Sequence, residues 1–471
     1  MISSTSSDGE VIEGKGHDVT GSPGCARHLQ AIRTSALMTV LAVVLVSTAA
    51  APAQADGISA GTPSCNSSTS TTTPTSSNTS QQSSVPGFSS AETAPITTTD
   101  LPRPTETRPT PFSVDGSCIT GLPVPNDGGS PSQVLGPDEN IWRADGPNLA
   151  RVLTRPPFTV SEFPVAGGPF YFTVGSDRAV WFTLSNTVGV GRVDPFDADS
   201  LRVIPLPGNV KVQYAIAAGA DGNIWTTDYR AHQFVRIEPH AAYRVTSIPF
   251  PPVSAPLFTG GACPGDIVAG PDGNLWFNCI GASNIIGRLS PFGQHEVTLF
   301  AVPGAGFTAA DITRGPWRDP ESIWFIGASS TGTNINIGRI GTRVPNELTL
   351  FPITPTGGPN AIGRGPDGNL WVTEGRTGYA IGRLRLGSHP AFTEFPLPDD
   401  VYARAPICGP DATEWFSTVP FGSTPAAQFE GRLDLRDLSS SRADTGDFDD
   451  DNGCRSPLHF FDLLGHSPVA D

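Results

Sequence analysis

The sequence lacks the short motifs that would assign it to a common enzyme class. Its repeat-bearing part, residues 116–436, contains no G-x-S-x-G, no H-E-x-x-H, no C-x-x-C and no phosphate-binding glycine-rich loop, which argues against several hydrolase, redox and nucleotide-binding families. The absence of these motifs leaves open a metal-free hydrolase whose catalytic residues come from distant parts of the chain. Residues 116–436 also lack a sustained helical period, so we expect few helices there.

Positive charge is scarce. The 29 Lys and Arg residues face 45 Asp and Glu residues, for a net charge of −16. Lys211 is the only lysine after residue 55. An acidic chain of this kind is a poor candidate for binding nucleic acid or an anionic membrane.

What the sequence does contain is a repeat. The string GPDGNLW occurs at 270–276 and again at 365–371. Looser copies end on seven tryptophans spaced 39, 44, 51, 48, 47 and 44 residues apart, a spacing that suits four-stranded propeller blades. The seven are Trp142, Trp181, Trp225, Trp276, Trp324, Trp371 and Trp415.

Each repeat continues in the same order. A Gly-Arg or similar pair follows the tryptophan, and an extended segment ending on proline comes next, as in IIGRL at 285–289 and FTEFPLP at 392–398. Gly-Pro-Asp-Gly favours a type I turn between two antiparallel strands. We therefore predict an all-β, seven-bladed β-propeller of four-stranded antiparallel blades. Its tryptophans should pack between blades, because they are too large to leave in solvent; a ligand-stacking surface is the alternative.

The boundaries of the propeller follow from the repeats and the flanking composition. The propeller should span 116–436, with residues 118–125 supplying the outer strand of the last blade and so joining the two ends of the ring. Residues 456–463 are the alternative for that strand. Residues 437–471 are predicted to form an acidic tail, with a weaker calcium-loop interpretation of its alternating aspartates.

The segment before the propeller has the composition of an export leader and a linker. Residues 1–55 carry basic residues, a short apolar run and Ala53-Gln54-Ala55, which predicts a signal peptide with a long leader. An uncleaved membrane anchor at the cell surface is the alternative. Residues 56–115 are rich in Ser, Thr and Pro and predict a disordered linker. The mature protein should be secreted, monomeric and without a membrane span.

Six cysteines remain after residue 55, an even number that suggests disulfides in an exported chain. Cys263 and Cys279 flank one predicted hairpin, so a bridge across it is expected. Cys118 could pair with Cys454 or with Cys408, and the sequence leaves both pairings open.

The loops after the tryptophans are where blades can differ without harming their packing. Two repeats place an acid three residues after the tryptophan and an arginine five residues after it: Asp228 with Arg230, and Glu374 with Arg376. His232 is the only histidine near such a loop. These residues are the candidates for a polar site at the channel mouth, binding a small molecule or peptide. The alternative is a solvated ion pair at each rim position.

The phrases GPDGNLWF, IIGRL and TEFPLP resemble the virginiamycin B lyase (streptogramin lyase) family over about 116–436. The resemblance implies a seven-bladed propeller. For active members it also implies a magnesium-assisted elimination that opens a cyclic depsipeptide ester, using Glu-x-His after a blade tryptophan. Glu374 matches that glutamate, but Arg376 stands at the histidine position, and no Glu-x-His closely follows any of the seven tryptophans.

Two functions are therefore open. The first is an exported propeller that binds a ligand at its channel mouth through Asp228, Arg230 and Arg376. The second, implied by the resemblance, is a C–O lyase in which Mg²⁺ is held by Glu374 and Asp228, with Glu374 as base and His232 as acid. The missing imidazole favours the first, because arginine does not act as a neutral proton acceptor.

Overall fold

A computed structural model describes residues 96–97, 104–114, 119–126, 132–210, 214–251, 263–280, 285–303, 307–329, 335–375, 379–398, 401–410, 412–420 and 428–438. All of them belong to the compact unit formed by residues 38–471. The signal peptide, most of the linker and most of the acidic tail expected from the sequence lie outside the described residues.

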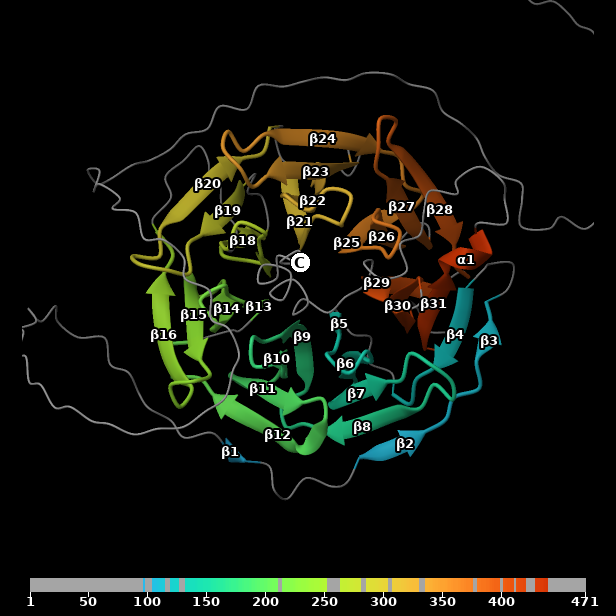
Figure 1. The fold of residues 1–471 in the computed structure, drawn as a ribbon, viewed down its shortest axis with the longest axis horizontal. Helices are drawn as coiled ribbons and strands as arrows, with labels where there is room; N and C mark the ends of the chain where they lie inside the picture. The colour runs from blue at the N-terminus through green and yellow to red at the C-terminus, as the bar shows by residue number, and fades with distance from the viewer. Residues whose placement is uncertain are drawn as a thin grey trace, which may run out of the picture. The chain divides into compact units, whose positions relative to one another are not determined.

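The described chain forms seven antiparallel sheets, and Figure 1 shows them arranged around a central axis. The first four blades, from inner to outer strand, are β5 (Gln133–Leu135), β6 (Ile141–Asp145), β7 (Asn148–Val152) and β8 (Val160–Pro164); β9 (Pro169–Val174), β10 (Val180–Leu184), β11 (Gly189–Asp194) and β12 (Asp197–Pro205); β13 (Ile216–Ala218), β14 (Ile224–Asp228), β15 (Gln233–Glu238) and β16 (Arg244–Pro249); β17 (Ile267–Ala269), β18 (Leu275–Asn278), β19 (Ile285–Leu289) and β20 (Val297–Ala301).

The last three blades follow the same plan. They are β21 (Phe307–Arg314), β22 (Ser322–Ser329), β23 (Ile335–Gly341) and β24 (Leu348–Ile353); β25 (Gly358–Arg364), β26 (Leu370–Gly375), β27 (Ala380–Arg385) and β28 (Ala391–Pro396); β29 (Val401–Gly409), β30 (Thr413–Pro420), β31 (Phe429–Asp434) and β4 (Ile119–Pro123). Each inner strand contacts the inner strands of both neighbouring blades, and β29 contacts β5. The fold is therefore the predicted seven-bladed propeller.

The ring closes with a strand from the beginning of the propeller. Strand β4 pairs antiparallel with β31 along five positions, from Phe429 opposite Pro123 to Leu433 opposite Ile119. The predicted use of 118–125 as the outer strand of the last blade is confirmed. The alternative segment, 456–463, lies outside the described residues, and the place beside β31 is taken. The only helix of the described part of the chain, α1 (Leu435–Leu438), follows directly.

The prediction of a disordered linker up to residue 115 is wrong for its last part. Strand β2 (Thr105–Thr107) pairs with β8, and β3 (Phe112–Ser113) pairs with β4. Further upstream, β1 (Ile96–Thr97) pairs with β12. The outer strand of a blade presents unpaired N–H and C=O groups, and a passing extended segment of any composition can satisfy them. Three blades thus gain a short fifth strand.

The repeated string is explained by one shared carboxylate. In the fourth blade the indole N–H of Trp276 donates to Asp272 of the turn at 3.0 Å. In the sixth blade the equivalent Asp367 accepts from Trp371 at 3.2 Å and forms an ion pair with Arg383 at 2.6 Å. That arginine lies opposite the tryptophan in the strand ladder. The turn aspartate, the tryptophan and the Gly-Arg pair therefore act as one unit.

The glycine of the Gly-Arg pair leaves room for an aromatic ring. In the fourth blade Gly287 lies opposite Phe277, and a Cβ on Gly287 would meet the phenyl ring at 2.0 Å. The same contact recurs at Gly191 with Phe182 in the second blade. All seven tryptophans are at most 1% exposed, and they pack in apolar clusters that join neighbouring blades. The packing role predicted for them is confirmed.

Candidate functional site

The two acids predicted for the channel mouth end equivalent strands and are both buried. Asp228 is the last residue of β14, and Glu374 is the next to last of β26. Each has 0% of its surface exposed. The alternative prediction, a solvated ion pair at each rim position, is therefore wrong for both carboxyl groups.

Asp228 caps the turn that follows its own strand. Its Oδ1 atom accepts the backbone N–H groups of Arg230 at 3.2 Å and Ala231 at 3.0 Å. Its Oδ2 atom accepts from Nε2 of Gln233 at 3.3 Å. This is the local hydrogen bonding that favours aspartate in turns. The carboxylate is thus turned toward the chain and not toward a ligand.

The remaining predicted residues of this loop lie at the surface. His232 is exposed, has a positive φ of 49°, and places Nδ1 3.0 Å from the carbonyl oxygen of Cys263. Arg230 is exposed, and Arg376 lies outside the described residues. Among the hydrogen bonds and ion pairs of the described part of the chain, none joins Asp228 or His232 to Glu374.

Glu374 sits in an acidic pair inside its own blade. Its Oε2 atom accepts the backbone N–H of Gly357 at 3.1 Å. Burial, together with a hydrogen bond and charge repulsion from Glu394 on β28, raises the pKa of Glu374 to about 9. Glu394 in turn accepts from the N–H and hydroxyl of Thr356 at 2.6 and 2.9 Å. At neutral pH Glu374 is therefore a neutral carboxylic acid.

These carboxyl groups do not fit a shared Mg²⁺ ion. Mg²⁺ in proteins is usually bound through one or two carboxylates, whereas Asp228 is engaged by three donors of its own turn and Glu374 lies in another blade, where its Oε2 atom accepts the N–H of Gly357. Among the residues that the structure describes, no group of three His, Cys, Asp or Glu side chains is placed to hold a metal ion.

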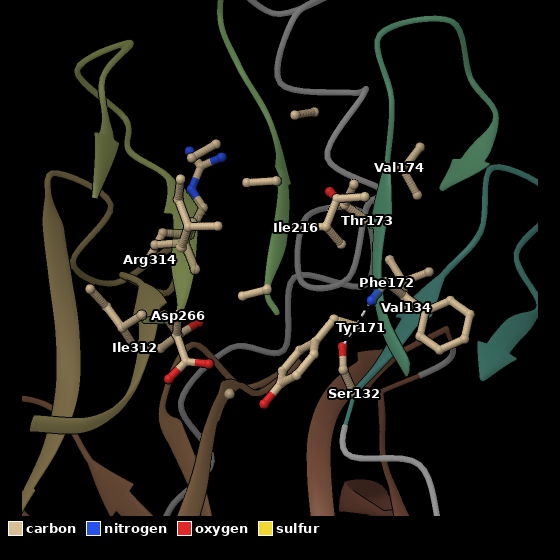
Figure 2. Close-up of a pocket in the computed structure, with 18 of the residues that line it drawn as sticks. Ser132, Val134, Tyr171, Phe172, Thr173, Val174, Ile216, Asp266, Ile312 and Arg314 are labelled. Carbon is tan, nitrogen blue, oxygen red and sulfur yellow. Dashed lines mark hydrogen bonds between the residues drawn. The ribbon is translucent and has the colours of Figure 1, made fainter. Parts of the chain in front are cut away.

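The seven inner strands enclose a cavity of about 490 Å³ along the central channel. Its polar end carries two aspartates from adjacent blades, Asp266 just before β17 and Asp311 on β21. Tyr171 from β9 and Tyr214 just before β13 lie beside them. Figure 2 shows the Tyr171 ring reaching across the cavity with its hydroxyl toward Asp266. Of these four residues, Tyr171, Asp266 and Asp311 line the cavity, and the ring of Tyr214 packs against that of Tyr171.

The environment of these groups favours their uncharged forms. Burial and the charge of Asp311 raise the pKa of Asp266, and burial raises the pKa of Asp311. Burial and the nearby aspartates also raise the pKa of both tyrosines. Strongly shifted groups at a cavity are a common property of binding and catalytic sites.

Specific hydrogen bonds hold the aspartates in place. Nδ2 of Asn278 donates to Oδ2 of Asp266 at 2.9 Å, and Oδ1 of Asn278 accepts the N–H of Asp266 at 2.7 Å. Asp311 accepts the N–H of Ile312 at 2.9 Å and that of Ile362, in the next blade, at 2.8 Å. The polar end is therefore preorganised and also connects two blades.

Sequence reasoning missed this group, although a signal for it existed. Counting four residues back from the turn glycine of each repeat gives one cavity-lining position per blade. Those positions are Ser132, Tyr171, Ala215, Asp266, Asp311, Ala361 and Ala405. Four of the seven positions carry a serine or an alanine. The other three carry Tyr171, Asp266 and Asp311. A comparison at the start of the repeat, and not only after its tryptophan, would have found this departure from symmetry.

Cys263 and Cys279 lie side by side across the β17–β18 hairpin, as predicted, with their Cα atoms 4.6 Å apart. Cys118 and Cys454 lie outside the described residues. No helix of the described chain is long and apolar enough to cross a membrane.

Comparison with known proteins agrees with the fold and the repeat. The chain is 27% identical over 253 residues to virginiamycin B lyase of Nocardia farcinica (strain IFM 10152), a match that covers 53% of this chain and 77% of the relative. Among solved structures, a catalytically inactive virginiamycin B lyase from Staphylococcus aureus with quinupristin superposes with a TM-score of 0.55 at 24% identity. The superposition covers 67% of this chain and 99% of that one.

A streptogramin B lyase structure gives a TM-score of 0.54 at 22% identity and covers 67% of this chain and 96% of that one. At this identity the structural matches establish the fold alone. The family model of the virginiamycin B lyases matches residues 158–445, which is more than half of the sequence. This chain therefore belongs to the virginiamycin B lyase family.

Proposed function

We propose that this protein is a ligand-binding propeller whose site is the polar end of the central cavity. The observation that carries the proposal is the group formed by Tyr171, Tyr214, Asp266 and Asp311 at one end of a cavity of about 490 Å³. Asp311 also connects two blades, but burying two aspartates and two tyrosines at one place costs stability, and a ligand site gives that cost a function.

The chemistry of this end defines the class of ligand. The phenols and the acid of Asp266, whose pKa is raised to about 8, donate and accept hydrogen bonds, and Asp311, whose pKa is raised to about 6, adds a carboxylate that accepts them. The adjoining wall is apolar and includes Ile216, Ile267 and Ile312. A small molecule or peptide with a largely apolar body and a few amide or hydroxyl groups is therefore the best match. Cyclic peptides such as the quinupristin named with the staphylococcal relative are of this class.

A second function, ring opening of a streptogramin B by C–O elimination, is favoured by family membership. In this chain it would rely on Glu374 as base and His232 as acid. Elimination needs an ionised base that reaches the substrate, whereas Glu374 is buried and its pKa is raised to about 9. We therefore place binding before catalysis.

The two functions are separated by one experiment on the full chain. Calorimetric titration with quinupristin, followed by chromatography and mass spectrometry after incubation with Mg²⁺, reports binding and ring opening independently. Binding without a linear product, weakened at least about tenfold in Asp266→Ala but not in the surface variant Glu321→Gln, supports the proposal. A linear product would favour the lyase. If quinupristin is neither bound nor opened, this class of ligand is excluded.

Export and a monomeric state belong to the same proposal. The juxtaposed Cys263 and Cys279 support a disulfide, which persists in oxidising compartments. We expect the mature protein in the culture medium, starting near residue 56, with these two cysteines resistant to alkylation until reduced. Recovery only from the cell interior with both thiols reactive would contradict export. A single monomer peak in light scattering is expected; a stable dimer would contradict the monomeric state.

A further inference from the structure

The cavity has a second ring of positions that breaks the sevenfold symmetry in a different way. The residue directly before the turn glycine of each repeat lines the cavity in every blade. From the first blade to the last, these are Leu135, Val174, Ala218, Ala269, Arg314, Arg364 and Cys408. Five blades place an apolar residue or a cysteine here, and two adjacent blades place an arginine.

The two arginines lie at the opposite end of the cavity from the aspartates. Arg314 follows Asp311 by three residues on β21, a separation of about 10 Å along a strand. Figure 2 shows Arg314 directed into the cavity, away from Tyr171 and Asp266. Arg364 ends the neighbouring inner strand β25. Ser176, Ala220 and Gly273 of the turns also line the cavity, so this end lies toward the turn face.

Two guanidinium groups so placed repel one another. Burial, and then the charge of Arg314, lower the pKa of Arg364 to about 10, and burial lowers the pKa of Arg314. Among the ion pairs of the described residues, none contains Arg364. Asp311, the nearest acid along β21, accepts two backbone N–H groups. The charge of Arg364 is therefore not paired with a described carboxylate.

We propose that Arg314 and Arg364 form a site for a small oxyanion, the phosphate, sulfate or carboxylate group of a ligand that enters from the turn face. The planar fork of a guanidinium matches the oxygen atoms of these anions, and two adjacent forks bind one anion from two sides. The low dielectric of the cavity strengthens the attraction. The site lies at the other end of the channel from the ligand site proposed above and does not depend on it.

The test is thermal unfolding of the full chain in inorganic phosphate or in malonate, each against sodium chloride at the same ionic strength. An anion that binds only the folded protein raises the unfolding midpoint. We expect a rise with at least one anion, and the comparison distinguishes a phosphate-type from a carboxylate ligand. Calorimetric titration with the more effective anion then gives the Kd.

Variants connect the effect to the two arginines. Arg364→Gln should raise the Kd for the anion at least about tenfold, because the charge-assisted hydrogen bonds from one guanidinium group are lost. The double variant Arg314→Gln with Arg364→Gln should lose the response. The surface variant Arg343→Gln should keep it, since that side chain is exposed and pairs with Glu321.

The stability of the anion-free double variant gives an independent measurement. Its unfolding midpoint should equal or exceed that of the wild type, since two buried like charges have been removed. If the double variant does not fold, Arg364→Lys replaces it; this variant keeps the charge without the fork and should bind more weakly. No rise for the wild type with either anion, or an unchanged rise in the double variant, would overturn the proposal.

Discussion

Glu374 offers the sharpest test of the electrostatics of this propeller. Replacing it by glutamine keeps the shape of the side chain and imitates the protonated acid. The change removes only the ability to ionise beside Glu394. The carbonyl of glutamine can still accept the N–H of Gly357, which donates to the carboxyl group at 3.1 Å.

The magnitude follows from the raised pKa. The pKa moves from 4.5, the ordinary value for a glutamate, to about 9 in the folded protein. The folded protein therefore holds one proton more than the unfolded chain between these values. The contribution of Glu374 to the free energy of unfolding is greatest below pH 4.5 and falls by about 1.36 kcal/mol for each pH unit as the pH rises toward 9. At pH 7 the accumulated loss is roughly 3 kcal/mol, which Glu374→Gln avoids.

Urea unfolding at several pH values between about 4 and 9 checks this prediction. The free energy of unfolding of Glu374→Gln minus that of the wild type should rise steadily with pH, to roughly 3 kcal/mol near pH 7. Glu321→Gln, which changes an exposed acid, should show a nearly constant difference. A constant difference for Glu374→Gln would refute the assignment of a neutral acid. It would also restore Glu374 as a candidate base for elimination.

Two further predictions concern the repeated unit. Asp367→Asn should destabilise the protein by about 2 kcal/mol, because the buried carboxylate that accepts the indole N–H of Trp371 loses its charge; urea unfolding measures the loss, and an unchanged midpoint would contradict the shared role. Gly287→Ala should cost more than about 2 kcal/mol, since its Cβ would overlap the ring of Phe277. Gly208→Ala, with nothing within 4 Å of the added Cβ, is the matched control and should change little.

The position of the polar site could not be predicted from the loops after the tryptophans alone. The loop positions predict Asp228 and Glu374 as site residues facing the channel mouth, whereas both are buried in the structure. Both lie at the end of the second strand of their blade, β14 or β26, where a side chain can turn into the blade and meet backbone N–H groups. Whether an acid at such a place faces solvent or the protein depends on neighbouring strands, which a one-dimensional pattern does not contain.

The architecture, in contrast, could be predicted from the amino-acid sequence alone. Seven copies of one unit, each with its own turn, tryptophan and Gly-Arg or similar pair, specify seven sheets, because every copy forms the same antiparallel pairing of strands. The closing strand β4 was also predictable, since the seventh repeat lacks its outer strand and one remains at the start of the propeller.

Which side chains share the channel depended on the three-dimensional arrangement of the blades. Asp266 and Asp311, or Arg314 and Arg364, stand about one repeat apart in sequence and meet because the blades close into a ring. The register of several inner strands also shifts, as between Pro359 and Ala361 of β25. Such a shift changes the face on which later side chains lie. Ring closure and strand register are properties of the whole fold, and they placed the charged groups of this protein.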